Sequence, residues 1–311
     1  MLPDIKDILK PRPRKYRNIA RHLSPLLLTQ EENSSSLSES DIFNDLSSSR
    51  GTERFLGLFS KLGIQFALKK FGIFQELKNA GLVNAQIQLD TSDAYKHMLR
   101  VVHPQGKLSL ISGEIVARRG HFIHPELPDY NLTKTDLDLI IVEWLLLQHP
   151  KKSFSRFRPQ LPGQEYPGLG IGQLVYETLY WAARRDGADG VLLIPNYLHT
   201  GLFYGRQFLF IDPVQEGLLY YIEKELLRKN KLDQLSWACS EGQIMDKTSN
   251  QLFQWKPTPM IMPVSLHLKD YFNSPAYSRI TQTSRKQYRL KIKKGYRKRY
   301  TSNWQAKTNA L

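Results

Sequence analysis

Cysteine and long apolar runs are nearly absent from this 311-residue chain. The single cysteine, Cys239, excludes an intrachain disulfide, and a cytoplasmic location is the default expectation for such a chain. The longest apolar stretch, Leu139 to Leu147, is interrupted by Glu143 and is too short to span a bilayer. The N-terminal residues include acids and no long apolar run, so they lack a secretory pattern. We therefore expect a soluble, cytoplasmic protein without a transmembrane segment.

Acidic residues are also absent from the C-terminal region, although the chain as a whole carries a net charge of +15. Residues 271–311 contain eleven Lys and Arg and no Asp or Glu, and residues 1–22 carry +5. The rest of the chain is close to neutral, at −1. We predict a basic tail over residues 281–311 that binds nucleic acid or an anionic surface, or that is simply solvated.

The remaining sequence divides into a polar leader and a folded part. Residues 1–52 combine a PRPRKYR segment with a serine-rich run, which predicts a disordered leader. A folded domain is expected over residues 53–230, followed by a helical and strand-containing extension over 231–280. The folded domain begins with one or two amphipathic helices over residues 53–81.

Short runs separated by turn residues predict an antiparallel meander of strands at residues 85–90, 96–103 and 107–117. The segment from Thr135 to His149 fits two structures. Thr135 and Asp138 form a capping-box pattern and Pro150 a stop, which favours a helix, whereas the β-branched residues favour a buried strand. We predict a helix there.

Three glycines lie just before a helical pattern in YPGLGIGQ, from Tyr166 to Gln173. Glycine allows a sharp turn and close approach to a ligand, and a helix N-terminus offers free N–H groups and a positive dipole end. This combination suits a phosphate. The pattern after the loop predicts a helix over residues 173–186 and a buried strand at Val191–Ile194. A second helix, capped by Asn196, is predicted to reach about residue 206. A strand at 208–211 and a helix that starts at Asp212 follow.

In this order and spacing the chain resembles the GNAT superfamily of acyl-CoA N-acyltransferases, over residues 166–213. The resemblance implies an α/β fold with a mixed, largely antiparallel sheet flanked by helices, and acetyl-CoA as co-substrate. It makes residues 53–230 an acyltransferase-like domain that transfers an acetyl group to an amine of unknown identity. The cofactor-binding residues it implies are Gly168, Leu169, Gly170, Ile171, Gly172, Gln173 and Asn196.

The resemblance also implies a catalytic role for Tyr204, which lies on the helix before the aromatic strand. Its phenol is placed to protonate the departing thiolate as a general acid. Candidates for a general base are Glu143 and Glu165, while His149 and His199 are possible proton shuttles. The first loop position is usually Arg or Gln in the family and is Pro167 here, which removes one donor and leaves activity open.

Two other kinds of site are disfavoured, and one alternative function remains. A Rossmann dinucleotide site is disfavoured because Gln173 stands where the third glycine belongs. His121 and His124 do not form a metal motif without a second pair of ligands, so no metal is predicted. A non-catalytic GNAT-like module that binds nucleic acid through its basic termini remains the alternative function.

Overall fold

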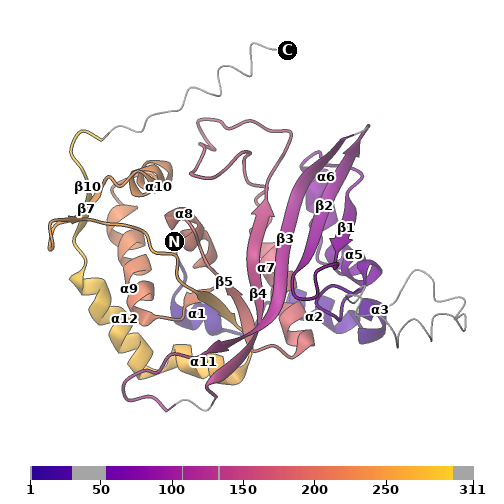
Figure 1. The fold of residues 1–311 in the computed structure, drawn as a ribbon, viewed down its shortest axis with the longest axis horizontal. Helices are drawn as coiled ribbons and strands as arrows, with labels where there is room; N and C mark the ends of the chain where they lie inside the picture. Colours follow the sequence, from indigo (N-terminus) through magenta and orange to yellow (C-terminus); the bar gives the residue numbers. More distant parts are fainter. Residues whose placement is uncertain (1, 30–53, 107, 132–133, 297–311) are drawn as a thin grey trace, which may run out of the picture.

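A seven-stranded sheet forms the centre of the computed structural model, which describes residues 2–29, 54–106, 108–131 and 134–296 (Figure 1). Its strands lie in the order β1-β2-β3-β4-β5-β9-β6. Their bounds are β1 (Gln86–Asp90), β2 (His97–Gln105), β3 (Leu108–Ile123), β4 (Asp136–Leu147), β5 (Gly190–Leu193), β6 (Leu209–Phe210) and β9 (Met260–Pro263).

All neighbouring pairs in this sheet are antiparallel except β4 and β5. The first three strands form the antiparallel meander that their short connections predict, and β4 pairs antiparallel with β3. Strands β4 and β5 are parallel and joined through a helix. The predicted fold class, a mixed and mostly antiparallel α/β sheet flanked by helices, is therefore confirmed.

The segment from Thr135 to His149 is not the helix that we predicted, because residues 136–147 form β4. This strand pairs with β3 along its whole length and with β5 over residues 139–142. Leu139, Ile140 and Val142 are buried. Two flanking strands satisfy the backbone and bury these side chains, and this outweighs the local capping pattern.

Helices cover the sheet, and several begin and end at the residues that the sequence indicates. They include α5 (Lys61–Lys70), α6 (Ile73–Asn79), α7 (Gly172–Asp186), α8 (Leu198–Tyr204) and α9 (Pro213–Tyr221). Gly72 separates α5 from α6 with φ +85°, and Gly187 ends α7 with φ +78°. The Asp212 side chain accepts a hydrogen bond from Val214 N and caps α9.

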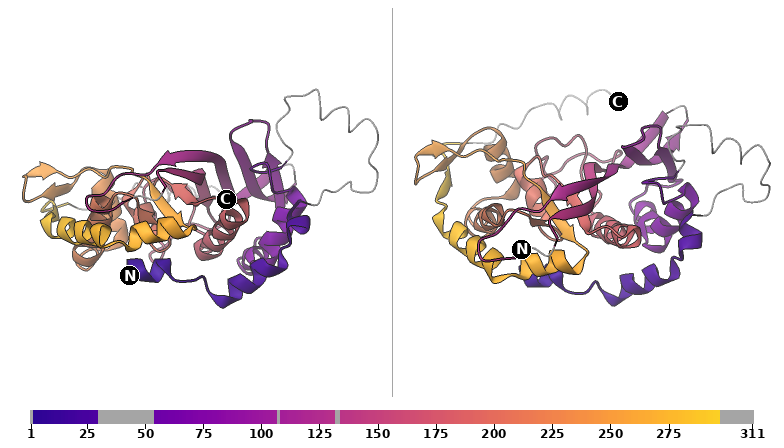
Figure 2. Two further views of the ribbon diagram at one scale, coloured as in Figure 1. Left: turned by 90° about the horizontal axis from the view of Figure 1, so that it is seen from below. Right: turned by 60° about the horizontal axis from the view of Figure 1, so that its bottom comes forward.

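The N-terminal residues 2–29 are helical, which corrects the predicted disordered leader over that range. They form α1 (Ile5–Leu9), α2 (Arg14–His22) and α3 (Pro25–Thr29), which run along the helical layer from α11 (Leu266–Asn273) to α5 (Figure 2). Long-range bonds hold them, such as Arg185 Nη2 to Ala20 O at 2.9 Å and Tyr220 Oη to Pro3 O at 2.9 Å. Residues 30–53 lie outside the described part of the chain.

The C-terminal third is part of the same body. It contributes a π-helix (Ile222–Leu226), α10 (Leu232–Ser240), α11, α12 (Pro275–Gln287) and a small sheet of β10 (Leu290–Ile292), β7 (Ile244–Asp246) and β8 (Gln251–Leu252). Strand β9 lies between β5 and β6. Residues 231–280, predicted as a helical and strand-containing extension, therefore supply an internal strand of the main sheet.

The predicted basic tail is also corrected at its start, because residues 281–292 include the end of α12 and strand β10. Residues 297–311 lie outside the described part of the chain. Within the residues that the structure describes, no helix has both the length and the apolar content needed to cross a membrane.

Candidate functional site

The glycine-rich loop is fixed directly to the end of β4. Gln148 and Gly168 form an isolated antiparallel bridge, and His149 N donates to Pro167 O at 2.7 Å. Leu169 and Ile171 line an apolar cavity of about 150 Å³ between α7, α5 and the sheet. The two aliphatic side chains of the loop are thus used for packing.

Four consecutive backbone donors lie at the start of α7. In the part of the chain that the structure describes, the N–H groups of residues 170–173 donate to no acceptor, and no side chain caps this helix. Gly170 has φ +80°, and a Cβ built there meets no atom within 4 Å. A left-handed residue beside open space, followed by free donors and the positive end of a 15-residue helix, is a geometry that binds anions.

The loop lies where the two parallel strands separate. The last pair between β4 and β5 is Val142 with Leu193, and β4 continues to Leu147 without a β5 partner. Glu143 is the extra residue of a β-bulge, since Ala117 pairs with Val142 and Val116 pairs with Trp144. Ligands of sheets with parallel strands bind beyond the carboxyl ends of those strands, and both β4 and β5 end on this side.

Tyr204 is the last residue of α8 and packs beside the start of α7. Its ring lies 6.2 Å from that of Tyr176 and 6.1 Å from that of Phe208, measured between centroids. A Cβ built at Gly172 would lie 3.5 Å from Tyr176 Oη, so one aromatic ring separates Tyr204 from the loop. Burial raises the pKa of Tyr204, which keeps its phenol protonated at neutral pH.

Glu143 is held by two cations, Lys96 just before β2 and Arg118 on β3. Its carboxylate accepts from Lys96 Nζ at 2.9 Å and from Arg118 Nε at 2.8 Å. These hydrogen bonds lower the pKa of Glu143. The carboxylate is therefore charged at neutral pH but is a weaker base than a free carboxylate.

The side chain of Gln173 is exposed and belongs to a polar network that reaches the buried Glu177 and the N-terminal segment. Gln173 Nε2 donates to Glu177 Oε1 at 3.1 Å and Gln207 Nε2 donates to Gln173 Oε1 at 3.2 Å. Glu177 has no exposed surface and pairs with the buried Arg12 at 3.3 Å. Arg12 also donates to Gln207 and lies 4.2 Å above the Tyr180 ring. This network fixes the first turns of α7.

The other residues singled out in the sequence have different roles. Asn196 is exposed beyond the carboxyl end of β5 but does not cap α8, which starts from Tyr197, where Thr200 Oγ1 accepts from Tyr197 N at 3.1 Å. His149 is buried, with Nε2 2.9 Å from Ala80 O. Burial lowers the pKa of His199 to about 4, so this ring is neutral at physiological pH.

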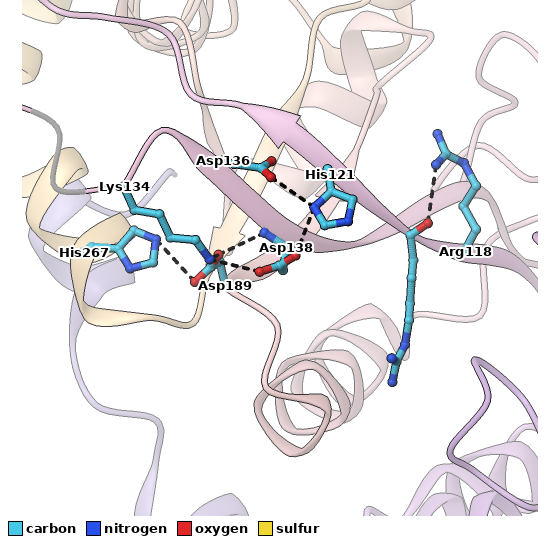
Figure 3. A network of polar contacts seen from close by, with 8 residues as sticks. Arg118, His121, Lys134, Asp136, Asp138, Asp189 and His267 are labelled. Atoms are coloured by element: carbon cyan, nitrogen blue, oxygen red, sulfur yellow. Dashed lines mark hydrogen bonds and ion pairs between the residues drawn. The ribbon is translucent and has the colours of Figure 1, made fainter.

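A second polar cluster lies at the opposite, amino-terminal ends of β4 and β5 (Figure 3). The Asp189 carboxylate accepts from Lys134 Nζ at 2.7 Å and from Asp138 N at 2.9 Å, and it lies 3.3 Å from His267 Nε2. His121 Nδ1 lies 3.0 Å from Asp138 Oδ1. The described residues contain no group of three or more His, Cys, Asp or Glu arranged to hold a metal. The cluster joins the two strands at the end away from the loop.

Sequence reasoning missed the buried pair of Arg12 and Glu177. The two residues are 165 positions apart, so no local pattern connects them. The PRPR segment is a partial signal of this contact. Its prolines prevent a helix around Arg12 and allow the chain to approach α7 in an extended conformation.

Comparison with known proteins gives structural matches only. No family model and no curated protein sequence matches the chain. Similar solved structures include a tyrosine-to-phenylalanine mutant of KacT, with a TM-score of 0.29 and 8% identity over 79% of this chain and 95% of that one. AtaTR bound with AcCoA has a TM-score of 0.25 and 12% identity over 50% of this chain and 80% of the other. Likeness at these TM-scores has no functional weight.

Proposed function

We propose that this chain is an acyl-CoA-dependent N-acyltransferase that transfers an acetyl group from acetyl-CoA to an amine. The observation that carries the proposal is the run of free N–H groups at residues 170–173. The loop that carries them is bridged to the end of β4, and the ring of Tyr176 lies between it and Tyr204. The sequence resemblance to GNAT acyltransferases over residues 166–213 supports the same function.

The loop suits the pyrophosphate of coenzyme A for three reasons. Its free backbone donors point to an anionic ligand, and the dipole of α7 adds positive potential at the same place. The open space next to Gly170 allows a bulky phosphate to approach the backbone. Pro167 supplies no N–H, and its carbonyl is already used by His149, so the donors of residues 170–173 carry the binding.

The chemistry then requires a proton for the leaving group. Acetyl-CoA supplies the acetyl group as a thioester. When the amine attacks, a C–N bond forms and the C–S bond breaks, and the departing thiolate needs a proton that Tyr204 Oη can donate. The amine gives up one proton to water, and Glu143, the candidate base from the sequence, has only a minor part in this step. Its ion pairs with Lys96 and Arg118 lower the pKa of Glu143 and make its carboxylate a poor proton acceptor.

Calorimetry on the full chain tests the donor site. We expect acetyl-CoA and desulfo-CoA to bind with similar affinity, because both carry the pyrophosphate that the loop contacts. Binding of neither ligand at millimolar concentration would overturn the proposal. Turnover is then measured as thiol release from acetyl-CoA in the presence of a panel of primary amines, and the amine that accelerates release identifies the acceptor class.

A further inference from the structure

A strongly basic concavity lies at the end of the molecule away from β1, next to the small sheet of β10, β7 and β8. It has a volume of about 790 Å³. We call it the basic groove and define it by its charged lining residues: Lys229, Lys247, Arg285, Lys286, Arg289 and Glu225. Five cations therefore face one carboxylate across a single hollow.

The five cations come from three segments far apart in the sequence, and the fold holds these segments together. Strand β10 pairs with β7, with Leu290 opposite Asp246, and α12 packs on α9. Tyr221 Oη accepts from Leu290 N at 2.8 Å, which ties the end of α9 to β10. The groove is thus built by defined backbone contacts and does not depend on a loose tail.

The charges of the groove are not neutralised within the protein. Among the residues that the structure describes, none of the five cations forms an ion pair, and all five are exposed. Arg289 Nη1 donates to the carbonyls of Lys286 and Tyr288, both at 2.7 Å, which orients its guanidinium. Clustered cations repel one another, and an external polyanion relieves that repulsion.

The shape of the groove indicates an extended anion. A single phosphate contacts two or three cations at once, whereas five cations around 790 Å³ match successive phosphates along a chain. A bilayer surface is nearly flat on this scale and meets a planar or convex patch more completely than a hollow. The sequence after residue 296 continues with four basic residues and no acid, in line with a partner that extends past the groove.

We propose that the basic groove binds the phosphate backbone of a nucleic acid. This inference goes beyond acetyl transfer and does not depend on it, because it uses no residue of the glycine-rich loop. It also differs from the expectation for the basic tail, since Lys229 and Lys247 lie outside residues 281–311 and residues 285–289 are part of a folded surface.

Binding of the full chain to a labelled RNA hairpin and to a DNA duplex, measured across salt concentrations, tests this proposal. The groove variant carries Lys247→Glu, Arg285→Glu and Arg289→Glu. The matched control carries Lys61→Glu, Lys69→Glu and Lys78→Glu, which are exposed residues of α5 and α6 and change the net charge equally. Circular dichroism verifies that both variants fold. If the groove variant does not fold, a triple variant with Gln at the same three positions replaces it.

We expect the wild-type protein and the control to bind with a steep dependence on salt. The groove variant should bind at least tenfold more weakly, with a slope of log K against log salt shallower by about 2 to 3, since each phosphate contact contributes about 0.7 to 0.9. Tighter binding to the RNA hairpin or to the DNA duplex identifies which nucleic acid the groove binds. Equal binding by the groove variant and the control, or binding only to phosphatidylserine vesicles, would overturn the proposal.

Discussion

The ring of Tyr204 packs edge-on against the ring of Tyr176, with 6.2 Å between centroids and 78° between planes. Tyr176 lies one turn after Gly172 on α7, and Tyr204 is the last residue of α8. This pair joins α7 and α8, which are separated in the sequence by β5. The orientation of the Tyr204 phenol is therefore coupled to the glycine-rich loop. The contact links the proposed donor site to the proposed acid.

Replacing Tyr204 with Phe should lower kcat by about 100-fold and leave the Kd for acetyl-CoA unchanged. The ring packing is kept, and only the proton donor is lost, which for general acids costs about 10² to 10⁴ in rate. Thiol-release kinetics and calorimetry measure the two quantities. Tyr176→Phe is the control, because it removes a neighbouring hydroxyl on the same contact. Unchanged turnover in Tyr204→Phe would remove this residue from the mechanism.

At Gly170, a negative charge should abolish acetyl-CoA binding, whereas a neutral residue of the same shape should not. Asp and Asn both tolerate the left-handed φ of +80° better than other side chains do, and the position opens into free space. Gly170→Asp places a carboxylate beside the pyrophosphate, while Gly170→Asn carries the same strain without the charge. We expect calorimetry to show no binding for the Asp variant and a loss of less than tenfold for the Asn variant. Equal affinities would place the pyrophosphate elsewhere.

The order of elements around the loop was predictable because each element carries its signals locally. Gly187 ends α7, Asp212 caps α9, and the run at residues 190–193 is buried on both sides. Each of these features depends on neighbouring residues only, so the sequence pattern is enough to indicate them.

The errors arose where distant residues decide the structure. Residues 136–147 match a helix by their caps, but pairing with β3 and β5 makes them a strand. The N-terminal helices are fixed by contacts such as Arg12 with Glu177, across 165 positions. Strand β9 enters the sheet between β5 and β6 from the segment predicted as a C-terminal extension. No pattern within a short window reports such pairings.

Replacing Glu143 with Gln should reduce kcat/KM by less than tenfold, a much smaller effect than that of Tyr204→Phe. Two hydrogen-bonded cations lower the pKa of Glu143, so its carboxylate accepts protons poorly at neutral pH. The side chain is partly exposed, and its ion pairs are screened by solvent, so the thermal stability should change little. Steady-state kinetics and thermal unfolding check both statements. A loss above 100-fold with unchanged stability would instead establish Glu143 as the base.

Stability should fall as the pH rises towards 8, because of Glu216 at the start of α9. Burial raises the pKa of this carboxyl to about 8, and its Oε2 accepts from Phe210 N at 2.8 Å. In the unfolded chain the pKa of Glu216 returns to about 4.3. The folded protein therefore binds a proton that the unfolded chain has released. Its stabilising contribution is complete below about pH 4 and is lost as the pH rises through 8.

Chemical unfolding of the wild-type protein between pH 5 and 9 should show this loss as a few kcal/mol, since each unit of pKa difference corresponds to about 1.4 kcal/mol. Glu216→Gln keeps an acceptor for Phe210 N and has no charge to bury, so its free energy of unfolding should vary much less over the same range. The exposed Glu76→Gln serves as the control and should follow the wild-type profile. Parallel profiles for the wild-type protein and Glu216→Gln would show that this carboxyl is already ionised in the folded state at neutral pH.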